Sequence, residues 1–222
     1  MTVTLSDQLI DEALRPYHVA TAPALRASIR AYIELLLRWN QRIALTTITD
    51  PAEILRLHFG ESMFAVNEVP IRHGRLADVG SGAGFPAIPI SMLVPELECV
   101  LIESNQKKAT FLAEVVRTLR LSRVQIFRGR MEDYPRSIEE FDYSISRALG
   151  VHQVFLDWSS KHLKPTGAII YWIGDEDGAK IAKDDSWNWR ALARIPGSES
   201  RSLLIGTVRN RQSRGHKSQC ST

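Results

Sequence analysis

The chain has 222 residues, of which 44% are hydrophobic and 24% charged, and its formal net charge is +3. This mixture is typical of a soluble globular protein with one large domain or a main domain and a small appendage. No apolar run approaches the roughly 18 residues of a transmembrane helix. The N-terminal residues show no basic segment followed by an apolar one, so we expect no secretory signal, and Cys99 and Cys220 form neither a disulfide framework nor a metal-binding pattern. We therefore expect a cytoplasmic protein, by default a monomer, without membrane association or a metal site.

The first third of the chain is predicted to be helical. In PALRASIRAYIELLLRWN, residues 23–40, apolar side chains recur at helical spacing. A second helix is predicted to start at Asp50, which can cap it, with Pro51 at the first helical position, and to run to Val66. Together these helices predict an N-terminal helical cap over residues 1–70.

The pattern then changes to short apolar strands that alternate with helices. Strands are predicted at 75–79, 98–102, 123–127, 141–145, 167–173, about 189–195 and 202–208. Such alternation is typical of a mostly parallel sheet covered on both faces, and the last two strands can form an antiparallel edge. The expected fold is a doubly wound, Rossmann-like α/β domain over 71–208 with a seven-stranded sheet.

The last residues, 209–222, have a different character from the domain before them. They are basic and polar, include Arg209 and Arg211, and show no periodicity. We expect a disordered tail. It can serve solubility or contact a polyanion such as RNA.

A glycine-rich loop follows the first predicted strand, in LADVGSGAGFPAIPI at residues 76–90. Ligands of such sheets bind where loops leave the carboxyl ends of the strands. Gly80, Gly82 and Gly84 remove side chains there, so a ligand can lie against the backbone. Asp78 precedes the loop, and Glu103 ends the second strand, where a carboxylate can accept both hydroxyls of a ribose.

Two classes of nucleotide-containing ligand could use this loop. A nicotinamide dinucleotide is usually bound by G-x-G-x-x-G, with the pyrophosphate at a helix N-terminus. Here the spacing is G-x-G-x-G, and Pro86 offers no N–H to an anion. The loop therefore favours a cationic ligand, the sulfonium of S-adenosylmethionine, over a dinucleotide.

Four segments carry a resemblance to a known family. RWNQRIALTTITDPAEILRLHFGES, LADVGSGAGFPAIPI, LIESNQKKATFL and SISRA occur in this order between Arg38 and Ala148. In sequence and spacing they resemble the guanine-N7 methyltransferases of small-subunit (16S) ribosomal RNA, the RsmG type, also called glucose-inhibited division protein B. The resemblance implies a cytoplasmic, S-adenosylmethionine-dependent enzyme that acts on ribosomal RNA or a ribosomal particle.

The resemblance, together with the glycine loop, defines candidate site residues. The candidates for binding the methyl donor are Asp78, Gly80, Gly82, Gly84, Phe85, Glu103, Met131, Glu132 and Arg147. The candidates for contacting RNA are Arg56, His58, Lys107, Lys108, Arg147, Arg209 and Arg211. For His58, its apolar neighbours favour a packed histidine that links the cap to the core over an RNA contact.

The chain departs from the family pattern at three positions. Ala44 stands where the family usually has asparagine. Leu57 and Ile173 stand where it often has arginine and lysine, at positions expected to face RNA. These losses of positive charge bear on substrate affinity more than on the reaction.

Methylation of guanine N7 requires little chemistry from side chains. N7 has an in-plane lone pair and no proton, so we expect no general base and no catalytic residue, only alignment, which can supply up to roughly 7–11 kcal/mol. An arginine across O6 and N7, the commonest protein contact to guanine, would block the nucleophile. We therefore expect an unpaired or extruded guanine, and Arg147 on a phosphate or on the donor carboxylate.

Two other functions remain open at this point. The chain could methylate another RNA, a protein or a small molecule. It could also be a non-catalytic RNA-binding assembly protein that retains a donor pocket. RNA binding predicts an affinity that falls steeply with salt, whereas a small-molecule methyltransferase would show little salt dependence.

Overall fold

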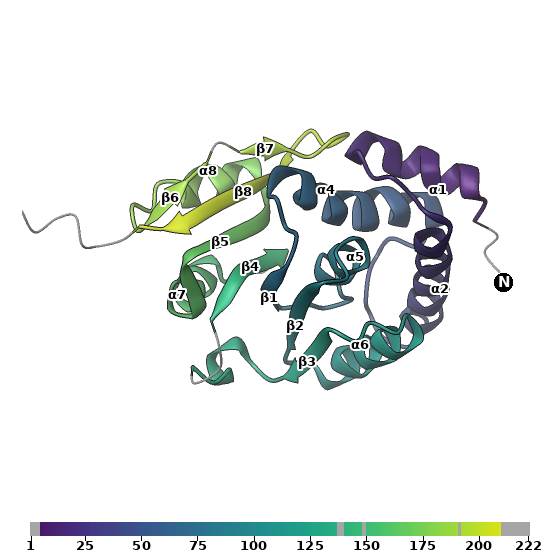
Figure 1. Ribbon diagram of the computed structural model, residues 1–222, viewed down its shortest axis with the longest axis horizontal. Coiled ribbons are helices and arrows are strands. Elements are labelled where there is room, and N and C mark those ends of the chain that lie inside the picture. Colours follow the sequence, from purple (N-terminus) through teal and green to yellow (C-terminus); the bar gives the residue numbers. More distant parts are fainter. Residues whose placement is uncertain (1–4, 137–139, 148–149, 191, 210–222) are drawn as a thin grey trace, which may run out of the picture.

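The N-terminal cap is a group of helices packed against one side of a central sheet (Figure 1). The computed structural model describes residues 5–136, 140–147, 150–190 and 192–209. The cap elements are α1 (Asp7–Leu14), the 3₁₀ turn η1 (Arg15–Tyr17), α2 (Pro23–Asn40), α3 (Pro51–Glu53), the π-helical segment η2 (Ile54–Gly60) and α4 (Glu61–Glu68). The predicted helix at 23–40 is confirmed with both of its ends.

The predicted helix from Asp50 to Val66 is present, but it is not a regular α-helix. It begins as expected, because Asp50 Oδ1 accepts the Glu53 N–H at 2.8 Å. Its middle is the π-helical segment η2. π-helical turns are rare in proteins, and those that occur are often found at functional sites. Gly60 ends this segment against the ring of Tyr17, which a Cβ at Gly60 would overlap. The wider turn thus lets η1 and η2 pack closely.

The sheet has eight strands in the order β3-β2-β1-β4-β5-β8-β6, with β7 also paired to β8. The strands are β1 (Gly74–Val79), β2 (Leu97–Glu103), β3 (Val124–Arg128), β4 (Phe141–Arg147), β5 (Leu163–Gly174), β6 (Trp187–Trp189), β7 (Ala193–Arg194) and β8 (Arg201–Val208). β1 to β5 are parallel, and β8 runs antiparallel to β5, β6 and β7. The predicted parallel sheet with an antiparallel edge is confirmed; the strand predicted at about 189–195 is two short strands.

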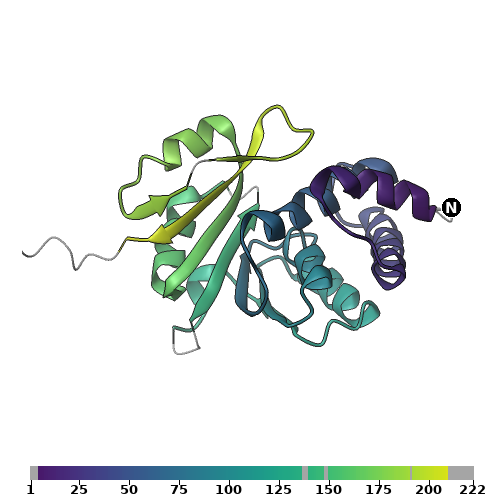
Figure 2. The same cartoon turned by 45° about the horizontal axis from the view of Figure 1, so that its top comes forward.

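Helices cover both faces of the sheet (Figures 1 and 2). On one face, α5 (Ala87–Leu93) and α6 (Gln106–Thr118) share a core with α2 and α4 of the cap. On the other face, α7 (His152–His162) and α8 (Asp175–Ile181) cover a second core. In Figure 2 the cap helices α1 and α2 lie at the end of the molecule opposite β6 and β8. Both faces of the central strands are thus buried, which explains their continuous apolar sequence.

Several expectations from the bulk sequence concern features outside the sheet. Of the predicted tail, residues 210–222, including Arg211, lie outside the described residues. Arg209 is described: its side chain is exposed and donates to Asn188 Oδ1 at 2.9 Å. Within the described ranges, no helix is both long and apolar enough to cross a bilayer, and no group of three or more His, Cys, Asp and Glu side chains could hold a metal ion.

Candidate active site

The glycine loop after β1 has one closed and one open side. Gly82 and Gly84 both have positive φ, +56° and +85°, which side chains other than glycine rarely adopt. A Cβ at Gly84 would lie 2.5 Å from Tyr32 Oη and 2.5 Å from Ile88 Cδ1, so the side of the loop at Gly84 is closed by these two side chains. A Cβ at Gly82 would meet only the Gly80 carbonyl oxygen, at 3.8 Å. The backbone at Gly82 can therefore be approached by a ligand.

Glu103 lies beside the open part of the loop. It ends β2, its side chain is buried, and both of its carboxylate oxygens accept backbone N–H groups. Oε2 accepts from Gly82 at 2.8 Å and Oε1 accepts from Asn105 at 2.7 Å. Each oxygen has a further lone pair, so the carboxylate can also accept a ribose hydroxyl. The predicted ribose contact of Glu103 is compatible with this geometry and stays a prediction.

Asp78 lies in the core beneath the loop. It is on the same face of β1 as Leu76, and only 1% of its surface is exposed. Neither carboxylate oxygen has a hydrogen-bond partner among the described residues. Burial in this setting raises the pKa of Asp78 to about 7, because the charged form loses its hydration. A cation bound near the loop would stabilise the carboxylate.

The turn after β3 lies beside Glu103 at the same edge of the sheet. Met131 begins the 3₁₀ turn η3 (Met131–Asp133) and is packed in the second core. Glu132 is exposed and lies 3.6 Å from Arg130, Oε2 to Nε. The Gly129 N–H donates to the Glu103 carbonyl at 3.2 Å, which holds this turn beside the end of β2. Of the predicted donor residues, the glycines, Glu103 and this turn therefore share one edge of the sheet.

Phe85 connects the glycine loop to the cap. Its ring stacks between Tyr32 of α2, at 5.1 Å between centroids and 11° between planes, and His58 of η2, at 4.7 Å and 20°. The Tyr32 hydroxyl donates to the Ala83 carbonyl of the loop. Phe85 itself is only 9% exposed, so most of its ring surface faces the cap.

His58 is a packed histidine, as its apolar neighbours favoured. Its Nε2 lies 2.8 Å from the Thr46 hydroxyl, and its ring covers Phe85. Burial, with a smaller contribution from the charge of Arg147, lowers the pKa of His58 to about 4. The ring is therefore neutral at pH 7, and it links the cap to the donor loop.

Arg147 lies at the end of β4 in a buried ion-pair cluster. Its Nη2 donates to Glu61 Oε2 at 2.9 Å and to the Leu57 carbonyl at 2.8 Å. Arg201, the first residue of β8, donates from Nη2 to the other oxygen, Oε1, of Glu61 at 2.6 Å. The sequence reasoning missed Glu61 and Arg201. The HFGES segment contained a signal for Glu61, an acidic residue in a largely apolar stretch of the second cap helix; nothing local pointed to Arg201.

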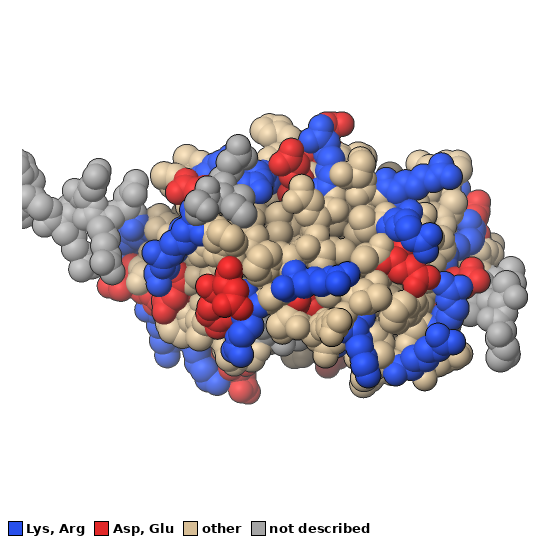
Figure 3. Space-filling view, turned by 90° about the horizontal axis from the view of Figure 1, so that it is seen from below, with Lys and Arg blue, Asp and Glu red and all other residues tan. Residues whose placement is uncertain are grey.

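The remaining RNA candidates are exposed at the surface. Arg56 and Lys107 are exposed and Lys108 is half-exposed; within the described ranges no acidic side chain pairs with any of them. Asn105 caps α6 by accepting the N–H groups of Lys107 and Lys108 at 3.0 and 3.1 Å. Because the Asn105 N–H also donates to Glu103, both lysines lie near the edge of the sheet that holds the glycine loop. Figure 3 shows the molecule from below, and on this face basic and acidic side chains are interspersed.

The three residues that depart from the family pattern, Ala44, Leu57 and Ile173, differ in their exposure to solvent. Ala44 is exposed in the loop after α2, and Leu57 contributes its carbonyl to Arg147. Ile173 is 6% exposed and packed in the second core. The expectation that position 173 faces RNA is therefore wrong, because β5 directs this side chain toward the helices that cover the sheet.

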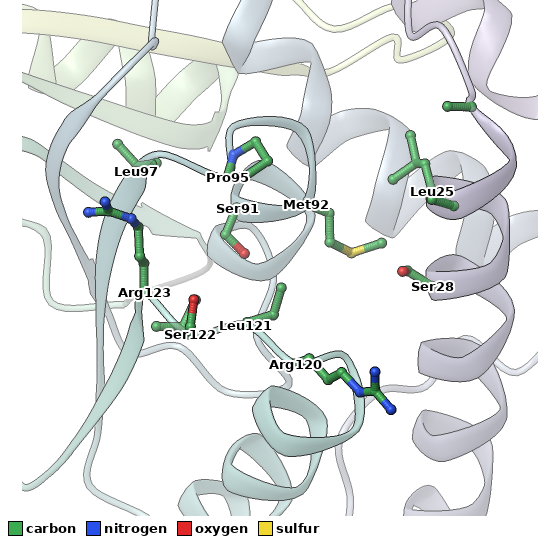
Figure 4. A pocket seen from close by; sticks show the side chains of 13 residues that line it. Leu25, Ser28, Ser91, Met92, Pro95, Leu97, Arg120, Leu121, Ser122 and Arg123 are labelled. Atoms are coloured by element: carbon green, nitrogen blue, oxygen red, sulfur yellow. The ribbon is translucent and has the colours of Figure 1, made fainter.

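A cavity of about 310 Å³ lies away from these residues (Figure 4). Its walls include Leu25 of α2, Met92 of α5, and Leu121 in the turn after α6. Leu97 and Val124, at the starts of β2 and β3, also line it. The cavity is thus at the amino edge of the sheet, opposite the glycine loop, and none of the predicted site residues line it.

The chain is similar to proteins of one described family. Residues 25–192 match the family model described as rRNA small subunit methyltransferase G, GidB. The ribosomal RNA small subunit methyltransferase G of Desulfitobacterium hafniense (strain Y51) is 40% identical over 177 residues, which cover 78% of this chain and 71% of that protein. The protein of the same name from Thermoanaerobacter sp. (strain X514) is 35% identical over 170 residues, covering 75% and 69%.

Solved structures show the fold at lower sequence identity. A SAM dependent methyltransferase from Aquifex aeolicus has a TM-score of 0.59 and 16% identity, covering 72% of this chain and 94% of that one. The glycopeptide N-methyltransferase MtfA complexed with sinefungin also has a TM-score of 0.59, with 9% identity, covering 69% and 87%. The sheet and its helices thus have the arrangement of S-adenosylmethionine-dependent methyltransferases.

Proposed function

Because the chain belongs to the rRNA small subunit methyltransferase G family, we propose that it transfers a methyl group from S-adenosylmethionine to N7 of a guanine in small-subunit (16S) ribosomal RNA. The observation that carries this proposal is the Glu103 carboxylate, fixed by the Gly82 N–H at 2.8 Å beside the open backbone of the loop. The family supports the RNA substrate, and the loop supports the donor.

The residues that would hold the donor come from three strand ends. Glu103 would accept the ribose hydroxyls, and the backbone at Gly80 and Gly82 would contact the donor directly. Met131 and Glu132 would border it from the turn after β3. When bound, S-adenosylmethionine supplies an electrophilic methyl group on a positively charged sulfur.

The proposed reaction requires the protein to position the acceptor guanine and the donor, and it requires no proton transfer. Guanine N7 attacks through a lone pair that carries no proton, and the product's charge replaces the charge of the sulfonium. Near the loop, His58 is neutral and stacked on Phe85, and Asp78 is buried below it. Neither side chain is placed to accept a proton from a substrate, and none has to be accepted. Alignment of the acceptor with the donor is the main contribution of the site.

The acceptor guanine would enter unpaired. Arg147 is anchored to Glu61 and to the Leu57 carbonyl, so it is held back from covering N7. The exposed Arg56 and Lys107 and the half-exposed Lys108 would contact the RNA backbone from this side of the molecule. We further propose that the protein acts in the cytoplasm as a monomer on RNA or a ribosomal particle. Residues 1–70 would act as cap, 71–208 as methyltransferase domain and 209–222 as basic tail.

The proposed reaction can be tested with purified protein and methyl-labelled S-adenosylmethionine. The acceptor is small ribosomal subunits, or their RNA, from cells that lack this gene, and the RNA is digested to nucleosides after reaction. We expect the label in 7-methylguanosine, and none with the Glu103→Ala variant. Label in another nucleoside would refute the N7 assignment. Donor binding by calorimetry without any transfer to RNA would refute the RNA substrate and leave the donor site intact.

A further inference from the structure

The cluster of Glu61, Arg147 and Arg201 joins three segments that are far apart in the chain. Glu61 is 1% exposed, and each of its carboxylate oxygens accepts one guanidinium N–H, at 2.9 Å from Arg147 and 2.6 Å from Arg201. Two positive charges thus share one negative charge. The cluster keeps a net charge of +1 although most of it is shielded from water.

Both arginines also keep a buried N–H without an acceptor. Arg147 Nη1 and Arg201 Nε have no hydrogen-bond partner among the described residues. Buried polar groups of proteins are nearly always paired, and an unpaired donor is costly. An oxyanion with several acceptor oxygens would match both the excess charge and the free donors. Neither of these two N–H groups is paired with Glu61, which accepts one other guanidinium N–H on each oxygen.

The cluster is at the edge of the sheet where the reaction is proposed. Arg147 ends β4, which pairs with β1 next to the glycine loop. Arg201 pairs with Gly174 at the end of β5, and its side chain is 43% exposed. The exposed Arg56 is in η2, five residues before Glu61. An anion that reaches this edge from solvent therefore meets Arg201 first, with Arg147 behind it.

We propose that Glu61, Arg147 and Arg201 form a binding site for one backbone phosphate of the RNA strand that carries the acceptor guanine. Arg147 and Arg201 donate to the phosphate oxygens. Glu61 is a positioning residue that holds the two guanidinium groups side by side. This site rests on the proposed function, since it requires an RNA substrate.

A purely structural ion pair and a phosphate site differ in salt dependence. A protein that neutralises a phosphate releases counterions, so the logarithm of its RNA affinity falls with the logarithm of the salt concentration. Loss of one phosphate contact lowers that slope by about 0.7–1. A clasp between cap and sheet would change the thermal stability and leave the slope unchanged.

The test measures the affinity of the full chain for a labelled fragment of small-subunit ribosomal RNA at a series of salt concentrations. Fluorescence anisotropy of the labelled RNA reports binding. The variant is Arg201→Gln, and the matched control is Arg123→Gln. Arg123 is 47% exposed and also bonds a carboxylate, Glu98, but at the amino edge of the sheet. We expect Arg201→Gln to lower the slope by about 0.7–1. The control should leave it unchanged, and Arg201→Lys, which keeps the charge, should restore most of it.

Donor binding, measured by calorimetry on the same proteins, separates the remaining outcomes. An unchanged salt slope in Arg201→Gln, with RNA bound normally, would overturn the phosphate site. A loss of donor affinity with the slope unchanged would also overturn it, because the oxyanion would then be the donor carboxylate. A lowered slope together with label in a nucleoside other than 7-methylguanosine would support the phosphate site and refute the proposed methylation position.

Discussion

Removal of the Glu61 side chain is expected to destabilise the fold far more than removal of an ordinary surface carboxylate. In Glu61→Ala, Arg147 loses its charged partner while its side chain stays 18% exposed. Breaking a buried pair in this way typically costs about 3–5 kcal/mol, because an uncompensated charge is left behind. Arg201 is 43% exposed and adds little, about 0–1 kcal/mol at most, as surface pairs do. The Trp172 bond to the Glu61 backbone carbonyl survives the change.

The assay is urea unfolding followed by circular dichroism, with Asp177→Ala as the control. Asp177 forms an exposed pair with Lys180 at 3.0 Å, so its loss should cost less than about 1 kcal/mol. For a chain of this size, 3–5 kcal/mol corresponds to a fall in Tm of roughly 6–20 °C. A loss in Glu61→Ala no larger than that of Asp177→Ala, at an unchanged m value, would refute the view that Arg147 depends on Glu61 for its charge balance.

Three further predictions concern the donor edge. Burial raises the pKa of Asp78 from 3.8 to about 7 in the folded protein, so folding takes up a proton in this range and the wild-type free energy of unfolding falls between about pH 4 and 7. Asp78→Asn should remove this fall, which is on the order of 4 kcal/mol, when the free energy of unfolding is measured by urea titration at several pH values. Parallel pH profiles of the wild type and the variant would contradict the raised pKa of Asp78. Glu103→Gln loses charged hydrogen bonds and weakens donor binding about tenfold or more by calorimetry, whereas Glu98→Gln, exposed on the same strand, leaves it unchanged. Gly84→Ala lowers Tm more than Gly82→Ala, because only its Cβ meets Tyr32 and Ile88 at 2.5 Å, and equal losses would disprove the closed and open sides of the loop.

The elements that the sequence predicted well are those whose signal is local. The strands at 75–79 and 98–102 were apolar runs, and the structure extends them only to 74–79 and 97–103. The position of Glu103 beside the glycine loop followed from the topology of parallel sheets, in which neighbouring strands end at one edge. The capping signal at Asp50 was also sufficient to place the start of its helix.

What the sequence could not predict depends on contacts between distant segments. Glu61 and Arg201 are 140 positions apart and meet only because β8 returns antiparallel beside β5. The π-helical segment ends at Gly60, which packs closely against the Tyr17 ring, and the apolar periodicity of the sequence shows neither feature. Ile173 was misplaced because the resemblance fixed its position in the chain but not the face of β5 on which its side chain lies.

The stacking of Phe85 between Tyr32 and His58 bears on how the protein can be divided. A boundary at residue 70 separates helices from the sheet in the sequence, but it cuts through this stack. A fragment of 71–208 would expose both faces of the Phe85 ring to water and would lose the Tyr32 hydroxyl that holds the Ala83 carbonyl. We therefore do not expect the glycine loop to keep its conformation in a fragment without the cap. Its contacts with Tyr32 of α2 and His58 of η2 come from segments that precede it in the chain, so we expect the cap and the sheet to unfold together.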